Sequence, residues 1–400
     1  MLNVRLSKTL VAATLVLACS TVQAESWDET VKEAKGQTVY FNAWGGSDTI
    51  NSYIQWAGEQ VKQTYGVTIE HVKITDAAAV VARILAEKTA ERSDDGSVDL
   101  MWVNGENFRN LKTNGLLQSP WTHNLPSYAL VDTDNKPTTT SDFGEPVDNL
   151  EAPWGMAQLV FMHDTATLPE PPQSMQALSM HAKANPGRVS YPKPPNFHGT
   201  TFIKQALLEL TEDPKELQKP ADQTDSATVT APLWDFLDAL HPTLWREGKN
   251  FPADGQQMRQ LLDDGELDIA LSFNPSEASR AIADGQLADT VRTYIHNSGT
   301  IGNTHFVAVP FNAKAKEGAM VFANFLMSAS AQLHKADPNV WGDPTVLAMD
   351  KLDADQRSAF ENAPRGVATL SPAELSPTLL EPHASWVELL ESEWLKRYGH

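Results

Sequence analysis

Four apolar segments of this sequence each end in a polar turn that opens a predicted helix. Apolar runs that alternate with amphipathic helices are typical of βαβ units and of sheets with parallel strands. The carboxyl ends of such strands form the crevice in which ligands bind. The four turns span residues 44–48, 104–107, 192–200 and 272–277.

A polar segment at residues 131–152, rich in Thr, Asp and Pro, divides these turns into two pairs. A chain of 400 residues with 41% apolar content is also too long for one compact domain to be the default expectation. We therefore predict an α/β fold with two lobes, in which the two pairs of turns face each other across a ligand cleft.

The pattern of each segment also predicts individual elements. Residues 50–61 carry apolar side chains at helical spacing, and Gly66 is expected to end that helix. Ser276 is expected to cap a helix that starts at residue 277. Residues 131–152 are expected to form a long loop and residues 211–230 a polar, mobile insertion. An apolar run is expected at 154–162, strands at 37–41, 67–74, 98–103, 188–191, 267–273 and 304–309, and helices at 77–90, 175–184, 200–210 and 317–333.

The first 24 residues have the pattern of a secretory signal peptide. Arg5 and Lys8 precede an apolar stretch at 10–18, and small residues at 22–24 form a cleavage site before Glu25. The mature protein is therefore expected in the periplasm. Residues around Cys19 also resemble a lipobox, which leaves a lipoprotein as the alternative. Because Cys19 is the single cysteine, disulfides and cysteine metal sites are excluded from the mature chain.

The charge balance excludes one class of partner. The chain has 31 Lys and Arg against 51 Asp and Glu, a net charge of -20. Such a chain repels polyanions, so no nucleic acid partner is expected.

The Trp-Gly-Gly-Ser-Asp turn at 44–48 has three possible roles: it could hold a phosphate, a catalytic nucleophile or a small ligand. It lacks the Lys that a P-loop places on phosphates, and the chain contains no nucleophile elbow, zinc-protease motif or dinucleotide fingerprint. His296 and His305 form only a spaced pair. We therefore expect no enzyme activity, no cofactor and no metal site.

Several stretches resemble the periplasmic solute-binding proteins of ABC importers, in the extracellular solute-binding group that includes polyamine, maltose and iron carriers. Within that group the resemblance is to a YnjB-type branch. It is carried by VYFNAWGGSDTINSYIQW, DLMWVNGENFRNLKTNGLL, APWGMAQLVFMHD with PEPPQSMQAL, NPGRVSYPKPPNFHGTTFIKQALLEL and LDIALSFNPSEA.

This resemblance implies a type II-like fold of two α/β lobes joined by at least two crossing strands, with the ligand trapped between them. It also implies a monomer that delivers its solute to a membrane permease and its ATPase. Residues 25–150 and 302–340 are predicted to form the N-terminal lobe, and residues 151–301 and 341–400 the C-terminal lobe. Iron carriers of the group have adjacent tyrosines in the second lobe, and residues 271–277 contain none, which argues against ferric ion.

The predicted ligand-binding residues lie at the strand ends and at the expected crossings between lobes. For Trp44 the alternative is core packing, for the two glycines a turn of positive φ, and for Ser47 or Asp48 a helix cap. The set comprises Trp44, Gly45, Gly46, Ser47, Asp48, Asn104, Glu106, Asn107, Trp154, Asn196, Phe197, His198, Thr200, Ser272, Asn274, Asn303 and Trp341.

These residue types suit more than one solute. Tryptophans with Asp48 and Glu106 suit an organic cation, whereas the Asn, Ser and Thr side chains also suit a sugar. Helix N-termini would favour an anion. We predict a small polar organic solute and favour a polyamine- or thiamine-like cation. A ligand-sensing or adaptor protein of the same fold is the alternative function.

Overall fold

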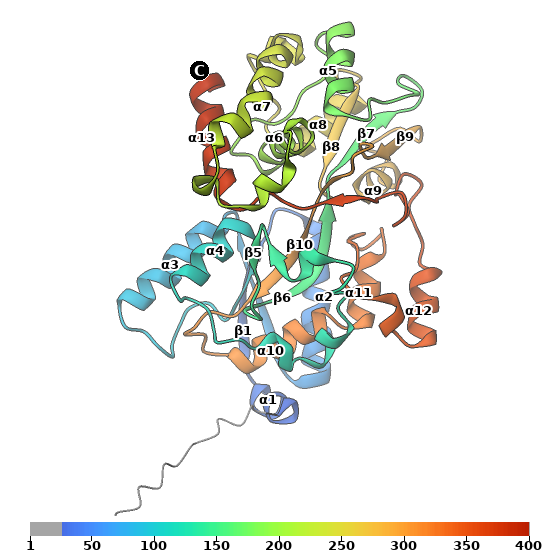
Figure 1. Cartoon of the computed structure of the whole chain (residues 1–400). Helices are drawn as coiled ribbons and strands as arrows, with labels where there is room; N and C mark the ends of the chain where they lie inside the picture. The colour runs from blue at the N-terminus through green and yellow to red at the C-terminus, as the bar shows by residue number, and fades with distance from the viewer. Residues whose placement is uncertain (1–25, 400) are drawn as a thin grey trace, which may run out of the picture.

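The computed structural model describes residues 26–399, so the predicted signal peptide and Cys19 lie outside the described residues. The described chain forms two α/β lobes, one above the other (Figure 1). Within residues 26–399, no helix combines the length and apolar character needed to cross a membrane.

The sheet of the N-terminal lobe has the order β11-β10-β3-β1-β2, and β6 also pairs with β10. Strands β1, β2 and β3 are parallel, whereas β10 is antiparallel to both β3 and β6. The strands are β1 (Thr38–Trp44), β2 (Thr68–Ile74), β3 (Leu100–Val103), β6 (Glu151–Gln158), β10 (Thr300–Ala308) and β11 (Thr378–Leu379). The helices are α1 (Trp27–Ala34), α2 (Asp48–Tyr65), α3 (Ala77–Thr89), α4 (Gly105–Thr113), α10 (Lys316–Leu326), α11 (Ala329–Ala336) and α12 (Ala354–Glu361).

The C-terminal lobe is built on a smaller antiparallel sheet with the order β8-β7-β9. Its strands are β7 (Val160–Asp164), β8 (Ile269–Ser272) and β9 (Val291–Tyr294). Its helices are α5 (Met175–Ala184), α6 (Phe197–Leu210), α7 (Ser226–Leu240), α8 (Gly255–Asp263), α9 (Glu277–Ala283) and α13 (Ser385–Tyr398).

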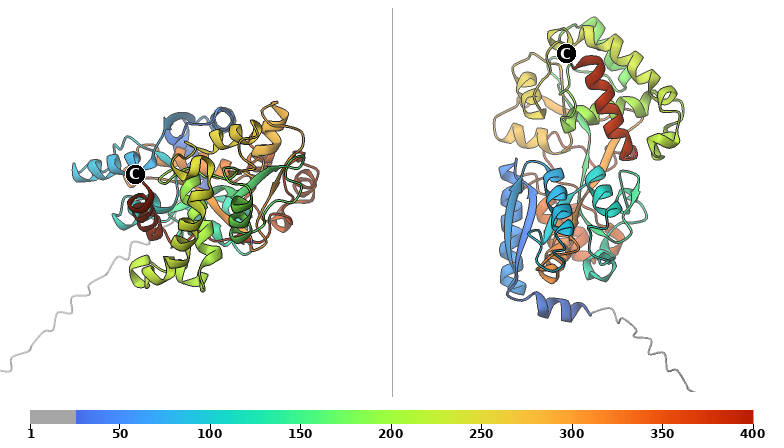
Figure 2. Two further views of the ribbon diagram at one scale, coloured as in Figure 1. Left: turned by 90° about the horizontal axis from the view of Figure 1, so that it is seen from above. Right: turned by 90° about the vertical axis from the view of Figure 1, so that its left-hand side faces the viewer.

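Two strand connections cross between the lobes. Only Leu159 separates β6 from β7, and a short segment links β9 to β10. The C-terminal chain crosses once more and runs between the lobes before α13 (Figures 1 and 2). The predicted two-lobed fold with crossing strands is therefore confirmed.

Each lobe has its own apolar core. Trp154 and Phe322 are fully buried in the core of the N-terminal lobe, and Phe202 and Trp386 in that of the C-terminal lobe. The predicted apolar face of α2 packs inward, and Gly66 ends this helix with φ of 74°. A left-handed residue at this position is a conformation that glycine adopts without a steric cost.

Three secondary-structure predictions were wrong. The segment 131–152 includes a hairpin of β4 (Ser141–Asp142) and β5 (Glu145–Pro146) rather than a plain loop. Residues 188–191 form no strand, since only isolated backbone hydrogen bonds join them to their neighbours. The insertion at 211–230 is folded, because it forms two short helical turns and the start of α7, and it buries Leu217.

Two helix predictions also need correction. The helix expected at 317–333 is two helices, α10 and α11, because the Ser328 hydroxyl caps the second by accepting from the Ala331 N–H at 3.3 Å. The Ser276 side chain does not cap α9. Its backbone N–H donates instead to the Asn274 amide oxygen at 2.9 Å, which stabilises the turn.

The last lobe boundary lies later than predicted. Trp341, Val346 and Leu347 are buried in the core of the N-terminal lobe, so this segment does not belong to the C-terminal lobe. The chain joins the core of the C-terminal lobe at Ala368. Residues 341–360 extend the first lobe because their apolar side chains complete its core.

Truncating Trp154 should unfold the protein far more readily than truncating Trp44. Trp154 is fully buried, whereas 44% of Trp44 is exposed. Loss of a buried Trp costs about 3–5 kcal/mol, and a surface change usually costs about 0.5 kcal/mol or less. Urea denaturation of Trp154→Ala and Trp44→Ala measures the difference. Equal losses of stability in the two variants would contradict the assignment of the core.

Candidate functional site

The carboxyl ends of β1 and β3 lie at one edge of the N-terminal lobe. The register pairs Phe41 with Leu100, so Trp44 ends at the level of Val103, next to the start of α4. Figure 2 (right) shows these blue strands ending just below the C-terminal lobe. The polar turns after β1 and β3 therefore lie at the boundary between the lobes, as the sequence predicts.

The turn after β1 presents an exposed tryptophan. A Cβ on Gly46 would lie 2.4 Å from the Trp44 indole, so only glycine lets the ring lie against this backbone. Ser47 caps α2, because its hydroxyl accepts from the Ile50 N–H at 3.4 Å. The cap is therefore Ser47 and not Asp48. Asp48 is the first residue of the helix, and its side chain is exposed. Gly45 donates its N–H to the Ile74 carbonyl at 3.0 Å.

The turn after β3 is bound to the neighbouring strand β10 of the same sheet. Asn104 donates to the Thr304 carbonyl of β10 and accepts from the Trp102 indole at 3.2 Å. Glu106 and the half-buried Asn107 follow in the first turn of α4. Burial raises the pKa of Glu106, Lys204 opposes this shift, and Glu391 and Glu381 add to it. The Glu106 side chain is nevertheless exposed to solvent, and it lies close enough to Lys204, Glu381 and Glu391 to feel their charges.

Carboxyl groups from both lobes converge around Glu106. We call Glu106, Asp142, Glu381 and Glu391 the interlobe acid cluster. Asp142 is fully buried and accepts from the Gly105 N–H at 2.6 Å, and its other oxygen has no partner among the described residues. Burial raises the pKa of Asp142 well above its usual range, and the carboxylates of Glu106 and Glu381 raise it further.

One lysine lies within this cluster. Lys204 of α6 pairs with Glu381 at 2.5 Å, and its ammonium lies 4.6 Å from the centre of the Phe143 ring. Phe143 is at the tip of the β4–β5 hairpin of the N-terminal lobe, and its carbonyl accepts from the Ala384 N–H at 2.9 Å. Asn303 of β10 donates to the second oxygen of Glu381 at 3.2 Å. These contacts join the hairpin, a crossing strand and the C-terminal lobe.

The predicted residues at the start of α6 differ in their roles. Asn196 caps the helix by accepting from the His198 N–H at 3.0 Å, so its side-chain oxygen already has a hydrogen-bond partner. Phe197 is 46% exposed and packs edge-on against Phe273. Burial lowers the pKa of His198, and the carboxylates of Glu277 and Asp254 oppose that shift. The Thr200 hydroxyl donates to Glu391 at 2.6 Å, so Thr200 contacts the interlobe acid cluster.

The predicted ligand-binding residues after β8 already form hydrogen bonds within the protein. The Ser272 hydroxyl donates to Glu277 and accepts from the Asn274 N–H at 2.9 Å. The Asn274 amide donates to the Trp341 carbonyl at 3.3 Å, which is a direct contact between the lobes. Ser272 and Asn274 therefore fix the turn and the lobe contact in this structure.

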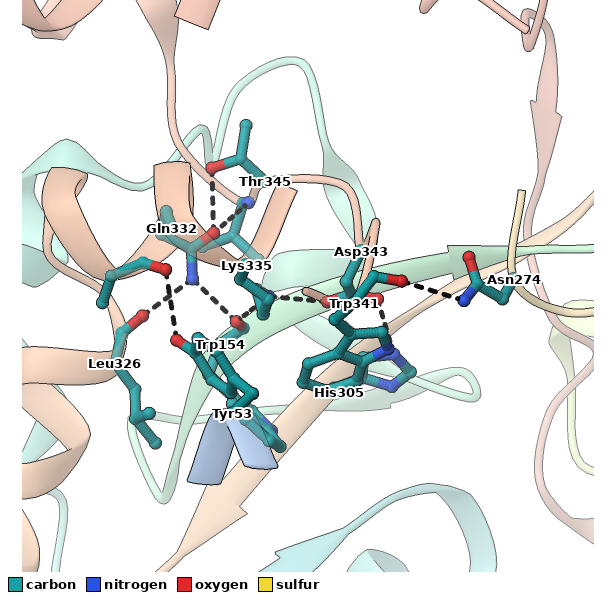
Figure 3. A network of polar contacts seen from close by, with 12 residues as sticks. Tyr53, Trp154, Asn274, His305, Leu326, Gln332, Lys335, Trp341, Asp343 and Thr345 are labelled. Atoms are coloured by element: carbon teal, nitrogen blue, oxygen red, sulfur yellow. Dashed lines mark hydrogen bonds and ion pairs between the residues drawn. The ribbon is translucent and has the colours of Figure 1, made fainter. Parts of the chain in front are cut away.

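An aromatic cluster supports the N-terminal side of this contact (Figure 3). The Trp341 ring stacks on His305 at 5.9 Å, and Trp102 meets His305 edge-on at 5.1 Å. Beneath them Lys335 is buried against Asp343 at 2.6 Å, and the second oxygen of Asp343 lies 3.2 Å from His305. Burial lowers the pKa of Lys335, whereas Asp343 opposes this shift.

Two of the predicted ligand-binding residues are buried within that cluster. Trp154 has no exposed surface and Trp341 has 5%, so neither indole is open to a solute in this structure. Trp154 was predicted to bind ligand because it lies where the chain crosses between the lobes, but its side chain points into the core. Its role is to pack against Trp102 and Trp341 at centroid distances of 5.0 and 5.3 Å.

The residues that sequence reasoning missed are Asp142, Phe143, Lys204, Glu381 and Glu391. Lys204 interrupts the apolar face of a predicted helix, and this anomaly could have drawn attention to it. Glu381 and Glu391 are distant in sequence from every predicted strand end. Only the final crossing of the chain brings them to the boundary between the lobes.

A separate surface hollow of about 460 Å³ lies between α7 and α13. Trp234, Asp235 and Arg397 contribute to its lining, and none of the predicted site residues does. Because it lies within one lobe, lobe closure would not change it. In the part of the chain that the structure describes, no group of His, Cys, Asp or Glu side chains has the arrangement of a metal site.

Replacing Lys335 alone should destabilise the protein more than replacing both Lys335 and its partner Asp343. Lys335→Met leaves Asp343 buried without its main partner, which typically costs about 3–5 kcal/mol. The double variant Lys335→Met with Asp343→Asn leaves no unpaired charge and should recover part of that loss. Urea denaturation measures both free energies of unfolding. A double variant less stable than the single one would contradict this account of the pair.

Comparison with known proteins adds independent findings. Residues 55–348 match the family model described as bacterial extracellular solute-binding protein. The chain is 49% identical to Protein YnjB from Escherichia coli (strain K12) over 376 residues, which cover 94% of this chain and 95% of YnjB.

Solved structures share the fold at low sequence identity. The spermidine/putrescine ABC transporter substrate-binding protein PotD from Streptococcus pneumoniae has a TM-score of 0.60 at 14% identity, covering 90% of this chain and 99% of PotD. The periplasmic binding protein AfuA from Actinobacillus pleuropneumoniae, bound to fructose-6-phosphate, also has a TM-score of 0.60 at 14% identity, covering 91% and 99%.

The family match covers most of the chain, and the identity to YnjB extends over nearly all of both proteins. The expectation that the chain is no enzyme agrees with this result. The chain belongs to the bacterial extracellular solute-binding protein family and is the solute-binding component of an ABC transporter.

Proposed function

We propose that this protein captures a small organic cation, of the polyamine class, between its lobes and delivers it to a membrane permease. The observation that carries the proposal is the interlobe acid cluster, in which Lys204 pairs with Glu381 while the carboxyl groups of Glu106, Asp142 and Glu391 have no lysine or arginine partner within ion-pair distance among the described residues. A periplasmic location follows from the predicted signal peptide and is part of the proposal.

The electrostatics of the cluster favour a positive solute. Burial raises the pKa of Glu106 and of Asp142, and neighbouring carboxylates raise both further, so these two groups have an unfavourable interaction with their neighbours. A cation placed among them would relieve that repulsion and gain charged hydrogen bonds. An anion such as a sugar phosphate would meet the same carboxylates and be repelled. The cluster therefore supports a cation over an anion.

The hydrogen-bonding groups give less support to a neutral sugar. Asn196, Ser272 and Asn274 were the main sequence argument for sugar binding. Their side chains already hold the α6 cap and the turn after β8. Aromatic rings remain open at the boundary, since Trp44 and Phe197 expose 44% and 46% of their surface. A desolvated cation gains about 2 kcal/mol over such a ring.

Capture and lobe closure are coupled in this proposal. Glu106 belongs to the N-terminal lobe, and Glu381 and Glu391 are held against the C-terminal lobe by Lys204 and Thr200. A cation can contact both sets of carboxylates only while the lobes are together, so it stabilises the closed form. One protein that shares the fold is a spermidine/putrescine-binding component, which agrees with this solute class.

Putrescine and spermidine should bind, whereas fructose 6-phosphate and maltose should not. Isothermal titration calorimetry of the mature protein measures the affinities. Glu106→Gln should weaken amine binding by about 10–100-fold, because a charge-assisted hydrogen bond contributes about 1.5–3 kcal/mol. Glu59→Gln, on the exposed side of α2, is the matched control and should bind as the wild type does. Binding of the sugars with no binding of amines would overturn the proposal.

Trp44→Ala tests whether the exposed indole is part of the site. We expect amine affinity to fall by about tenfold, with a nearly unchanged melting temperature, because the ring is 44% exposed and does not belong to the buried core. A variant with wild-type affinity would remove Trp44 from the site, and the acid cluster alone would have to account for binding.

Amine affinity should fall as the pH is lowered. Only the ionised form of Glu106 attracts a cation, and its pKa is raised, so the loss begins at a higher pH than for an ordinary glutamate. Calorimetry between pH 5 and 8 measures this dependence, and Glu106→Gln should flatten it. An affinity that rises on acidification would contradict the proposed role of Glu106.

A further inference from the structure

We infer that Lys204 determines how many positive charges the preferred solute carries, by neutralising one carboxylate of the interlobe acid cluster. The inference rests on the proposed capture of a cation, and it concerns selectivity among cations. It assigns Lys204 a specificity role that a merely structural ion pair would not have.

Contacts on several sides hold Lys204 in place. Its side chain is only 2% exposed, and its ammonium forms the 2.5 Å pair with Glu381. The Phe143 ring of the other lobe lies 4.6 Å away, close enough for a cation–π interaction. Because the ammonium is buried between two lobes and paired, it is a fixed charge and not a mobile surface lysine.

The Phe143 backbone indicates that this placement has a function. Phe143 has φ of 44° and Gly144 has φ of 78°, a left-handed pair typical of a tight hairpin turn. Asn or Asp is the usual residue at the first of these positions, and phenylalanine is strained there. The ring also needs Gly105 beside it, since a Cβ on Gly105 would lie 2.8 Å from it. Strained, closely packed side chains of this kind occur mainly at functional sites.

The hydrogen bonds divide the carboxylates into two groups. Glu381 is satisfied on both oxygens, by Lys204 and by the Asn303 amide. Asp142 is buried and accepts from the Gly105 N–H, so it is not open to a solute. Glu106 is open to solvent, and within residues 26–399 the hydrogen bond that Glu391 accepts comes from the neutral Thr200 hydroxyl. Two carboxylates of the cluster therefore remain to be compensated, which matches a solute with two positive charges.

The charge of the site can be changed in both directions at this pair. Lys204→Met removes the ammonium and leaves Glu381 as a third uncompensated carboxylate. Glu381→Gln keeps the ammonium and removes one negative charge, so the net charge of the site becomes more positive by one. The double variant Lys204→Met with Glu381→Gln restores the original charge without any ion pair, so it separates charge from shape.

The experiment is calorimetric titration with putrescine, which carries two charges, and spermidine, which carries three, at one low ionic strength. The measured quantity is the ratio of the two dissociation constants. Lys204→Met should move this ratio toward spermidine by about tenfold, since one added charged contact is worth about 1.4 kcal/mol or more. Glu381→Gln should move it the opposite way, and the double variant should return to within about threefold of the wild-type ratio.

The outcomes separate the two proposals. If the wild type binds amines and the ratio stays the same in Lys204→Met and Glu381→Gln, Lys204 has no role in charge selection and the inference is overturned. A double variant that keeps the shifted ratio of Lys204→Met would overturn it as well, because shape would then be the cause. If the wild type binds no amine, the proposed function fails first. Should Lys204→Met not fold, Glu381→Gln and the double variant still decide the matter.

Discussion

The pairing of β6 with β10 is the constraint on which the rest of the structure depends. These strands pair from Gly302 to Ala308 in the N-terminal lobe, and both continue directly into the sheet of the C-terminal lobe. Any relative movement of the lobes must therefore bend the chain near Leu159 and in the short link before β10. Because Asn303 and His305 lie on β10 beside this boundary, the same strand that joins the lobes also carries polar groups into the space between them.

The boundary between the lobes has two chemically different halves. On one side, aromatic rings around His305 pack over the buried Lys335–Asp343 pair and contact the turn after β8 through Trp341. On the other side, carboxyl groups of both lobes gather around Lys204 and the Phe143 ring. The first half resembles an extension of the core and gives the lobes a defined contact. The second half holds charge that is only partly compensated, and this is the chemistry from which we infer a cationic solute.

The fold was predictable from the sequence because its signals are local. Apolar runs followed by polar turns identified β1, β3 and β8, and α5 was predicted from Met175 to Ala184 as the structure has it. The failures have local causes as well. Ser328 divides a helix that periodicity alone would continue. Residues 188–191 make only isolated backbone hydrogen bonds and so form no strand. The lobe boundary near residue 341 was wrong because core membership depends on packing across the whole chain.

The candidate site was predictable only in part. Trp44 and Glu106 were predicted because they lie at or just after strand ends, and their role in binding a solute stays a prediction. Ser47 and Asn196 were ambiguous from the start, since capping and binding use the same atoms, and both are caps. Glu381 and Glu391 were missed because no sequence pattern shows that the C-terminal chain returns between the lobes. Long-range placement of charge, rather than local structure, limits what the sequence reveals.

We propose that an organic cation binds between the lobes. Native mass spectrometry of the protein purified from cells, compared with the mass after denaturation, tests it most directly. The account predicts a retained small molecule whose mass and fragmentation identify an amine with two or more positive charges. A retained sugar, sugar phosphate or other anion would contradict it.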